Sequence, residues 1–279
     1  IDTDDQIRLI KNICKAENVD AKKISPKYIL AVIDKWKNKG LYPDDVIIKK
    51  NTLEKNFLAI YKIYQKKLIN LNAADFSDLI LHTVKIFENY KDISGLYSKK
   101  FKYILVDEYQ DTNFIQSKWL KHLSQHNNNI CCVGDDDQSI YSWRGAEIKN
   151  FLEFDKVYKN TKIIRLEKNY RSTQNILNVA SNLIENNQNR VGKKLFTNHG
   201  EGEKVALTCF RNVKDEATEI GSDIEILKKK YSLNEISILV RAIFQTREFE
   251  ERFLKIGIPY RIVGGIKFYE RAEIKDCIA

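Results

Sequence analysis

Hydrophobic residues recur at helical spacing over the first 97 residues of the chain. Ser25 and Pro26 suit the cap and first position of a helix, and Gly40 suits its end. No alternating strand pattern interrupts this part, which therefore predicts a helical region without strands. Further amphipathic helices are predicted over residues 7–14, 51–71 and 75–90.

After residue 100 the pattern changes, because short apolar runs alternate with helical segments. Such alternation is typical of β-α units with a parallel sheet, so we expect an α/β fold. Strands are predicted over residues 102–107, 129–134, 161–166, 203–210, 235–241 and 260–263.

The stretch FKYILVDEYQDTN, residues 101–113, joins an apolar run to two acids. The run predicts a short buried strand, with Asp107 and Glu108 at its carboxyl end. Ligands of open α/β sheets bind at that edge. An Asp held there can bind Mg²⁺ while its Glu neighbour polarises an attacking water, which is what nucleotide hydrolysis requires.

A capping role is the alternative for the acids of this stretch. Asp111 with Thr112 would cap a helix predicted over residues 113–125, because acids near a helix N-terminus are favoured by the helix dipole. Taken alone, the stretch favours the metal site and the cap equally.

A second stretch, ICCVGDDDQSIYSWRGA at 130–146, also runs from a strand into a polar cluster. Gln138 suits a phosphate or an attacking water, and Arg144 suits phosphate charge. Tyr141 and Trp143 offer flat faces on which bases stack with ~1–3 kcal/mol each. The alternative is that both aromatics belong to the core. The adjacent Arg144 and the polar loop favour stacking for Trp143.

A third stretch, LEKNYRST at 166–173, lies between a predicted strand and a predicted helix. Arg171 provides a charged fork suited to a γ-phosphate, and Tyr170 provides a face for a nucleobase. Ser172 and Thr173 begin the helix, where capping is their simplest role.

The composition gives the chain a net positive charge. The chain has 279 residues, a net charge of +9 and five cysteines. The charge suits a polyanionic partner. The cysteines lack zinc or disulfide spacing, which predicts a reducing, cytoplasmic setting. No run approaches ~20 apolar residues, so we expect no membrane span.

Together the three stretches resemble motifs of the UvrD/Rep/PcrA family of superfamily 1 DNA helicases. VDEYQDTN resembles the Walker B motif, VGDDDQSIYSWRGA motif III and LEKNYRST motif IV. YRIVGGIKFYERAEIKD at 260–276 resembles the segment that leads from the second motor domain into an inserted domain. NAADFSDLI at 72–80 is similar to the element before Walker B, with Ser77 where the family usually has an acid.

This resemblance implies two RecA-like motor domains of parallel-sheet type with an α-helical insertion. Residues 1–97 would be part of that insertion, 98–165 part of the first motor domain, and 166–279 the start of the second. The family implies ATP-driven movement on single-stranded DNA and unwinding with 3′ to 5′ polarity at duplex junctions, in repair or replication, with DNA repair proteins as further partners.

The resemblance also assigns roles around ATP. Asp107 would hold Mg²⁺ and Glu108 would activate the hydrolytic water. Gln138 would sense the γ-phosphate, Tyr170 would stack on adenine, and Arg171 would reach the γ-phosphate from the second motor domain.

On the DNA side the resemblance assigns three residues. Tyr141 and Trp143 would lie against the single strand. Arg144 would bridge the DNA and ATP sites.

The phosphate-loop motif of the family is not found in this sequence. No Gly-Lys-Ser/Thr phosphate loop occurs, since Gly192 and Lys193 are followed by Lys194. We expect that loop before residue 1 and motifs V and VI after residue 279, so this chain alone should not hydrolyse ATP efficiently. Two alternatives stay open: a helicase subunit of a RecB-like or AddA-like recombination nuclease, and a non-catalytic remnant that binds single-stranded DNA.

Overall fold

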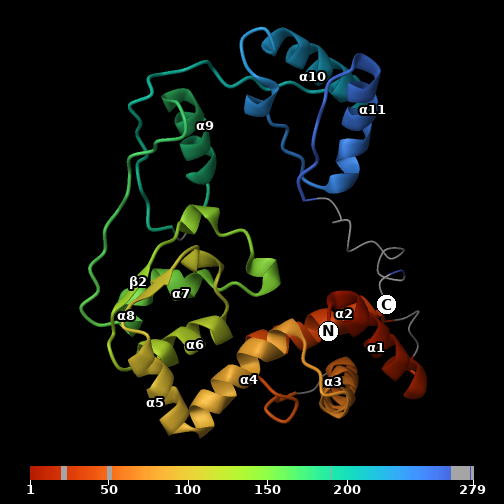
Figure 1. Cartoon of the computed structure of the whole chain (residues 1–279), viewed down its shortest axis with the longest axis vertical. Coiled ribbons are helices and arrows are strands. Elements are labelled where there is room, and N and C mark those ends of the chain that lie inside the picture. Colours follow the sequence, from red (N-terminus) through yellow and green to blue (C-terminus); the bar gives the residue numbers. More distant parts are fainter. Residues whose placement is uncertain (20–23, 49–51, 189, 265–276, 278–279) are drawn as a thin grey trace. The chain divides into compact units, whose positions relative to one another are not determined.

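The structure is a computed structural model that describes residues 1–19, 24–48, 52–188, 190–264 and 277. The chain divides into two compact units, Ile1–Glu203 and Lys204–Ala279 (Figure 1), and each is described by itself.

Among the described residues of the first hundred positions the structure has five helices and no strand, in agreement with the predicted helical region. Ser25 caps the second one by accepting a hydrogen bond from the Tyr28 amide, and Pro26 is its first residue. A core of mostly Ile and Tyr side chains joins the first three helices. The helices are α1 (Thr3–Ala16), α2 (Pro26–Asn38), α3 (Thr52–Asn70), α4 (Phe76–Asn89) and α5 (Lys91–Lys100).

A buried ion cluster connects α2, α3 and α4. Lys37 Nζ lies 2.6 Å from Asp75 Oδ2 and 2.7 Å from Asp78 Oδ1, and all three side chains are fully buried. The Tyr64 hydroxyl donates to Asp75 and the Gln65 amide donates to Asp78. Buried charges are tolerated only when paired and hydrogen-bonded, so each helix depends on the other two at this point.

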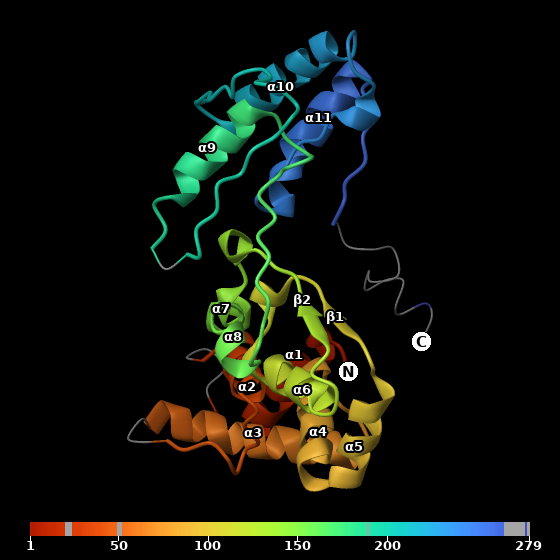
Figure 2. The ribbon, with the colours of Figure 1, turned by 90° about the vertical axis from the view of Figure 1, so that its left-hand side faces the viewer.

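Two short strands form a parallel pair, with Ile104 opposite Ile130 and Val106 opposite Cys132. They are β1 (Ile104–Val106) and β2 (Ile130–Cys132), and the crossover between them contains α6 (Phe114–Ser124). Figure 2 shows the strands side by side. The predictions of strands within 102–107 and 129–134 and of a parallel sheet are therefore confirmed.

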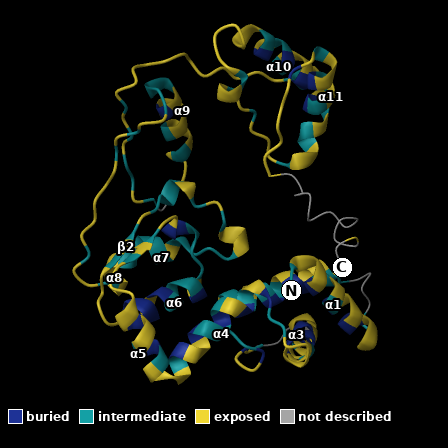
Figure 3. Ribbon diagram, in the orientation of Figure 1, coloured by how far each residue is buried: buried dark blue, intermediate teal, exposed yellow. Residues whose placement is uncertain are grey.

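The prediction that these strands are buried is wrong. Leu105 is 82% exposed and Val133 is 51% exposed. Within the described residues the sheet has only these two strands, so too few neighbours cover its apolar side chains. Figure 3 shows exposed and intermediate residues along this segment.

The other four predicted strands are also not formed among the described residues. Apart from Glu235, which ends a 3₁₀ helix, these segments have no regular secondary structure, and a nearby parallel contact is a single bridge between Lys168 and Phe196. Apolar content marks a segment that can enter a sheet, whereas a strand also requires a neighbour's N–H and C=O groups. The segments concerned are 161–166, 203–210, 235–241 and 260–263.

The remaining helices complete the two units. In the second unit, α10 packs on α11 through Ala217, Phe249 and Phe253. None of the helices in the described part of the chain has the length and apolar character needed to cross a membrane. The α-helices are α7 (Ile148–Leu152), α8 (Phe154–Val157), α9 (Gln174–Ile184), α10 (Val213–Leu227) and α11 (Thr246–Ile256). Short 3₁₀ helices cover Tyr109–Asp111, Asp136–Gln138, Ser142–Arg144, Leu233–Glu235 and Ile243–Gln245.

Replacing the buried lysine should strongly destabilise the first unit. Lys37→Ala leaves two carboxylates buried without their counter-charge, and we expect a loss of about 3–5 kcal/mol in the free energy of unfolding. Urea unfolding followed by circular dichroism measures this loss.

The control is Lys62→Ala, which removes an exposed pair with Asp44. We expect that change to cost less than about 1 kcal/mol. Equal losses for the two variants would mean that the buried cluster is not a determinant of stability.

Candidate active site

Polar side chains follow both strands at the same edge of the sheet. Asp107 and Glu108 come directly after β1, and an acidic turn, residues 135–137, follows β2. The pairing continues beyond the strands, since the Val133 amide donates to the Val106 carbonyl (2.8 Å). Because parallel strands share one carboxyl edge, residues distant in sequence meet at the place where α/β proteins bind ligands.

The chain turns sharply at Glu108. Its backbone adopts the left-handed conformation (φ 50°, ψ 42°), which is uncommon for a residue other than glycine and is concentrated at functional sites. Asp107 Oδ1 accepts a hydrogen bond from the Glu108 amide (2.9 Å). Glu108 Oε2 accepts one from Gln110 Nε2 (2.7 Å). Both carboxylates are exposed to solvent.

The capping alternative for Asp111 and Thr112 is wrong. Helix α6 is capped by Asn113, which exchanges side-chain-to-backbone hydrogen bonds with Gln116 (2.9 Å each). Asp111 Oδ1 is buried and has no hydrogen-bond partner in the described structure. Burial, and secondly the charge of Glu108, raise the pKa of Asp111 above its ordinary value.

Gln110 connects the two strand ends. Its side chain is almost fully buried, donates to Glu108 and accepts a hydrogen bond from the Asp135 amide (2.9 Å). Gln110 is not among the functional residues predicted from the sequence. The signal in the sequence is weak, because one amide between two acids has no spacing that distinguishes it from a surface residue.

The acidic turn is balanced by two basic side chains from the segment after α9. Arg190 makes a forked contact with Asp137 (2.8 and 2.7 Å), and Lys193 pairs with Asp135. Burial alone would raise the pKa of Asp135, but hydrogen bonds from Lys193 and Gln138 lower it. No local sequence pattern predicts this contact, because Arg190 and Asp137 are 53 positions apart.

The loop after the acidic turn presents aromatic and cationic groups. Gln138 is exposed and donates to Asp135 Oδ2 (2.7 Å). The Arg144 guanidinium lies 5.0 Å from the Tyr141 ring and 4.7 Å from the Trp143 ring. Trp143 is 71% exposed, so the alternative that it is a core residue is wrong.

Tyr170 and Arg171 lie ahead of α9. The Tyr170 ring is 74% exposed, with Lys168 Nζ 5.0 Å from its centre. Over the described residues, no hydrogen bond or ion pair joins Tyr170 or Arg171 to Asp107 or Glu108. The structure therefore links the turns that follow β1 and β2 through Gln110, but it does not link Tyr170 or Arg171 to the two acids.

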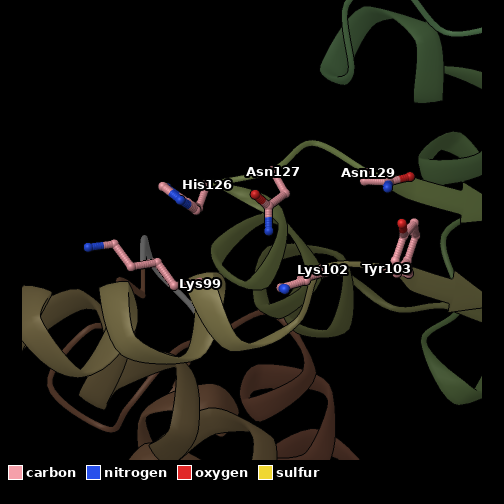
Figure 4. Close-up of a pocket in the computed structure, with 6 residues that line it drawn as sticks. All are labelled: Lys99, Lys102, Tyr103, His126, Asn127 and Asn129. Carbon is pink, nitrogen blue, oxygen red and sulfur yellow. The ribbon is translucent and has the colours of Figure 1, made fainter.

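A surface pocket of about 330 Å³ lies next to the amino ends of the two strands (Figure 4). Tyr103 comes directly before β1 and Asn129 directly before β2. The pocket is therefore at the amino ends of the strands, away from the carboxyl edge that carries the acids. Its lining residues are Lys99, Lys102, Tyr103, His126, Asn127 and Asn129.

Comparisons with known proteins agree with the motifs at this edge. The model of the UvrD/REP helicase N-terminal domain matches residues 1–159, and that of the UvrD-like helicase C-terminal domain matches residues 164–279. Most of the predicted motif at 260–276 lies outside the described residues, which end at 264 before resuming at 277.

Similar relatives cover the whole chain. It is 47% identical to a probable DNA helicase II homolog of Rickettsia conorii, 44% identical to the ATP-dependent DNA helicase PcrA of Bacillus subtilis and 41% identical to DNA helicase II of Escherichia coli. The chain spans 43%, 38% and 39% of the lengths of these three relatives.

The site and the fold define an α/β protein with a carboxylate pair at the edge of a parallel sheet. The comparisons define it further: the chain belongs to the UvrD/REP helicase family.

Removing the forked arginine contact should loosen the segment after α9. Arg190→Gln deletes two charge-assisted hydrogen bonds, so we expect roughly tenfold or faster hydrogen exchange at the Val191 amide, which donates to Asp136. Hydrogen exchange read by NMR measures this change.

The matched control is Arg247→Gln, which removes an exposed pair with Glu251. It should leave exchange at Val191 unchanged. Unaltered exchange in the Arg190 variant would show that the ion pairs do not hold the segment.

Proposed function

We propose that this chain is part of an ATP-dependent DNA helicase that moves along single-stranded DNA with 3′ to 5′ polarity. The main support for this proposal is that Asp107 and Glu108 lie at the same sheet edge as the polar loop after β2. That arrangement supports hydrolysis of a nucleotide at the sheet edge, coupled to a surface that suits DNA.

Glu108 is the proposed general base. Its carboxylate is exposed at the strand end and is oriented by one hydrogen bond from Gln110, which leaves its other oxygen available to a water molecule. A base must lie within hydrogen-bond reach of the proton that it removes, and a rigid strand end provides such a position.

Asp107 is the residue that we assign to Mg²⁺. Its Oδ1 accepts the Glu108 amide, whereas no described residue bonds to Oδ2, so an oxygen of the kind that Mg²⁺ prefers is available. A bound Mg²⁺ would neutralise the charge on the β- and γ-phosphates of ATP.

Gln138 and Arg144 are the proposed link between the nucleotide and DNA. Gln138 bonds to the same turn that Gln110 contacts, and Arg144 lies against both aromatic rings. Tyr141 and Trp143 then serve as the stacking platform for the bases of a single strand. The basic net charge of +9 favours the approach of DNA.

Tyr170 and Arg171 complete the proposed nucleotide site. Both side chains are exposed, so a base can stack on the tyrosine and a γ-phosphate can meet the guanidinium. In this proposal residues 1–97 belong to a helical insertion of the first motor domain, 98–165 to that motor domain and 166–279 to the second. DNA junctions and repair proteins are the proposed partners.

Glu108→Gln tests the proposed base. The amide keeps the shape but cannot accept the proton, so in the protein extended by the flanking family motifs we expect Mg·ATP binding to persist while hydrolysis falls at least about 100-fold. Steady-state phosphate release and binding of a fluorescent ATP analogue measure the two properties.

Glu153→Gln is the control, since Glu153 forms ion pairs with two exposed lysines, Lys149 and Lys156. Its turnover should match that of the unmodified protein. Near-normal turnover in the Glu108 variant would show that Glu108 is not the general base.

Trp143→Ala tests the stacking platform. Loss of one base–aromatic stack of ~1–3 kcal/mol should weaken binding of oligo(dT) about 5- to 150-fold and reduce DNA-stimulated turnover far more than the basal rate. Fluorescence anisotropy and phosphate release measure these effects.

Phe244→Ala provides the comparison, because Phe244 is 83% exposed and lies outside the proposed site. It should bind DNA normally. If the Trp143 variant lost basal turnover and thermal stability together with DNA binding, its role would be structural.

A further inference from the structure

Gln110 is a buried amide between two parts of the site. It is 1% exposed, although a glutamine is usually found at the surface. Its Nε2 donates to Glu108 Oε2 (2.7 Å) and its Oε1 accepts from the Asp135 amide (2.9 Å). Burial of an amide is costly unless its groups are hydrogen-bonded, and here both ends are used.

The backbone of the second strand end is shaped around this side chain. A Cβ on Gly134 would lie 2.6 Å from Gln110 Oε1 and 2.8 Å from the Phe151 ring, closer than real Cβ atoms come. Only a glycine therefore lets the turn after β2 approach Gln110 without displacement. The atom approached is the same Gln110 Oε1 that accepts the Asp135 amide, so the glycine and the hydrogen bond both place the turn against this side chain.

The other partner is equally constrained. Glu108 adopts a left-handed backbone conformation, and its carboxylate accepts a hydrogen bond from the side-chain amide of Gln110, two residues later in the chain. A rotation of the Gln110 side chain would break the bonds to Glu108 and to Asp135 together. The position of the Glu108 carboxylate is thus tied to the position of the turn after β2.

We propose that Gln110 is a positioning residue that couples the loop carrying Tyr141 and Trp143 to the carboxylate of Glu108. The inference rests on the proposed function, in which Glu108 is the base and the loop contacts DNA. When DNA moves the turn at Asp135, the amide transmits the movement to Glu108. Gln110 itself touches neither ATP nor DNA.

Two substitutions of Gln110 test this role by changing its two hydrogen bonds in different ways. Gln110→Glu retains an acceptor for the Asp135 amide but places a carboxylate against Glu108. Gln110→Met has a similar length and removes both bonds. In the protein extended by the flanking family motifs, we expect both variants to lose about 10- to 100-fold in DNA-stimulated kcat, the range seen when an orienting group is removed. The KM for ATP and the Kd for oligo(dT) should change less than about twofold, because no substrate contact is lost.

Gln116→Glu is the matched control. It makes the same amide-to-carboxylate change six residues away, and its remaining oxygen can still accept the Asn113 amide in the helix cap. Its kcat should equal that of the unmodified protein. Melting temperatures of all variants show whether a loss of kcat accompanies unfolding.

Two results would overturn the coupling role. One is a kcat within threefold of the unmodified protein in both Gln110 variants. The other is a parallel loss of kcat, DNA binding and melting temperature, which is what a purely structural glutamine would produce. Glu108→Gln measured alongside separates this inference from the proposed function: if that variant turns over normally, the proposed base is wrong, whereas if it is inactive and the Gln110 variants are normal, only the coupling is wrong.

Discussion

Parallel pairing of β1 with β2 is the constraint on which the candidate site depends. The register places Val106 opposite Cys132, so the residues that follow each strand leave the sheet at one edge. A shift of one residue would turn the side chains of a strand to its opposite face and move the acids away from the turn. The site therefore consists of two turns held by a few backbone hydrogen bonds and by one buried glutamine.

The helical part supports this edge through a different interaction. Lys37, Asp75 and Asp78 fix α2, α3 and α4 to one another, and α4 packs against α6, the helix between the two strands. Asp75 also caps α4 in a capping box with Asp78, so the same carboxylates end the preceding loop and pair with the lysine. The short motif NAADFSDLI thus serves packing and charge balance through its two acids.

Local sequence patterns predicted the parts of the fold that local interactions determine. The helix cap at Ser25, the two strands and the acids at the end of the first strand all follow from composition and spacing. Burial of β1 and pairing of the later strand candidates did not follow, because both depend on which neighbours cover an apolar segment.

In the candidate site, too, local patterns predicted some residues, whereas contacts between distant residues were not predicted. Asp107 and Glu108 were identified from one stretch, since a strand followed by acids is a local signal. Gln110 was missed, because its role depends on Gly134 and Asp135 more than twenty residues later. The ion pair between Arg190 and Asp137 was missed for the same reason. Contacts of this kind require the folded structure.

ATP hydrolysis with and without single-stranded DNA tests the central claim most directly, on this chain and on the protein extended through the flanking motifs of the family. We expect that the extended protein hydrolyses ATP, that DNA stimulates its turnover, and that this chain alone shows little activity. Binding of DNA without turnover in the extended protein would contradict the claim that the edge at Asp107 and Glu108 is a centre of nucleotide hydrolysis.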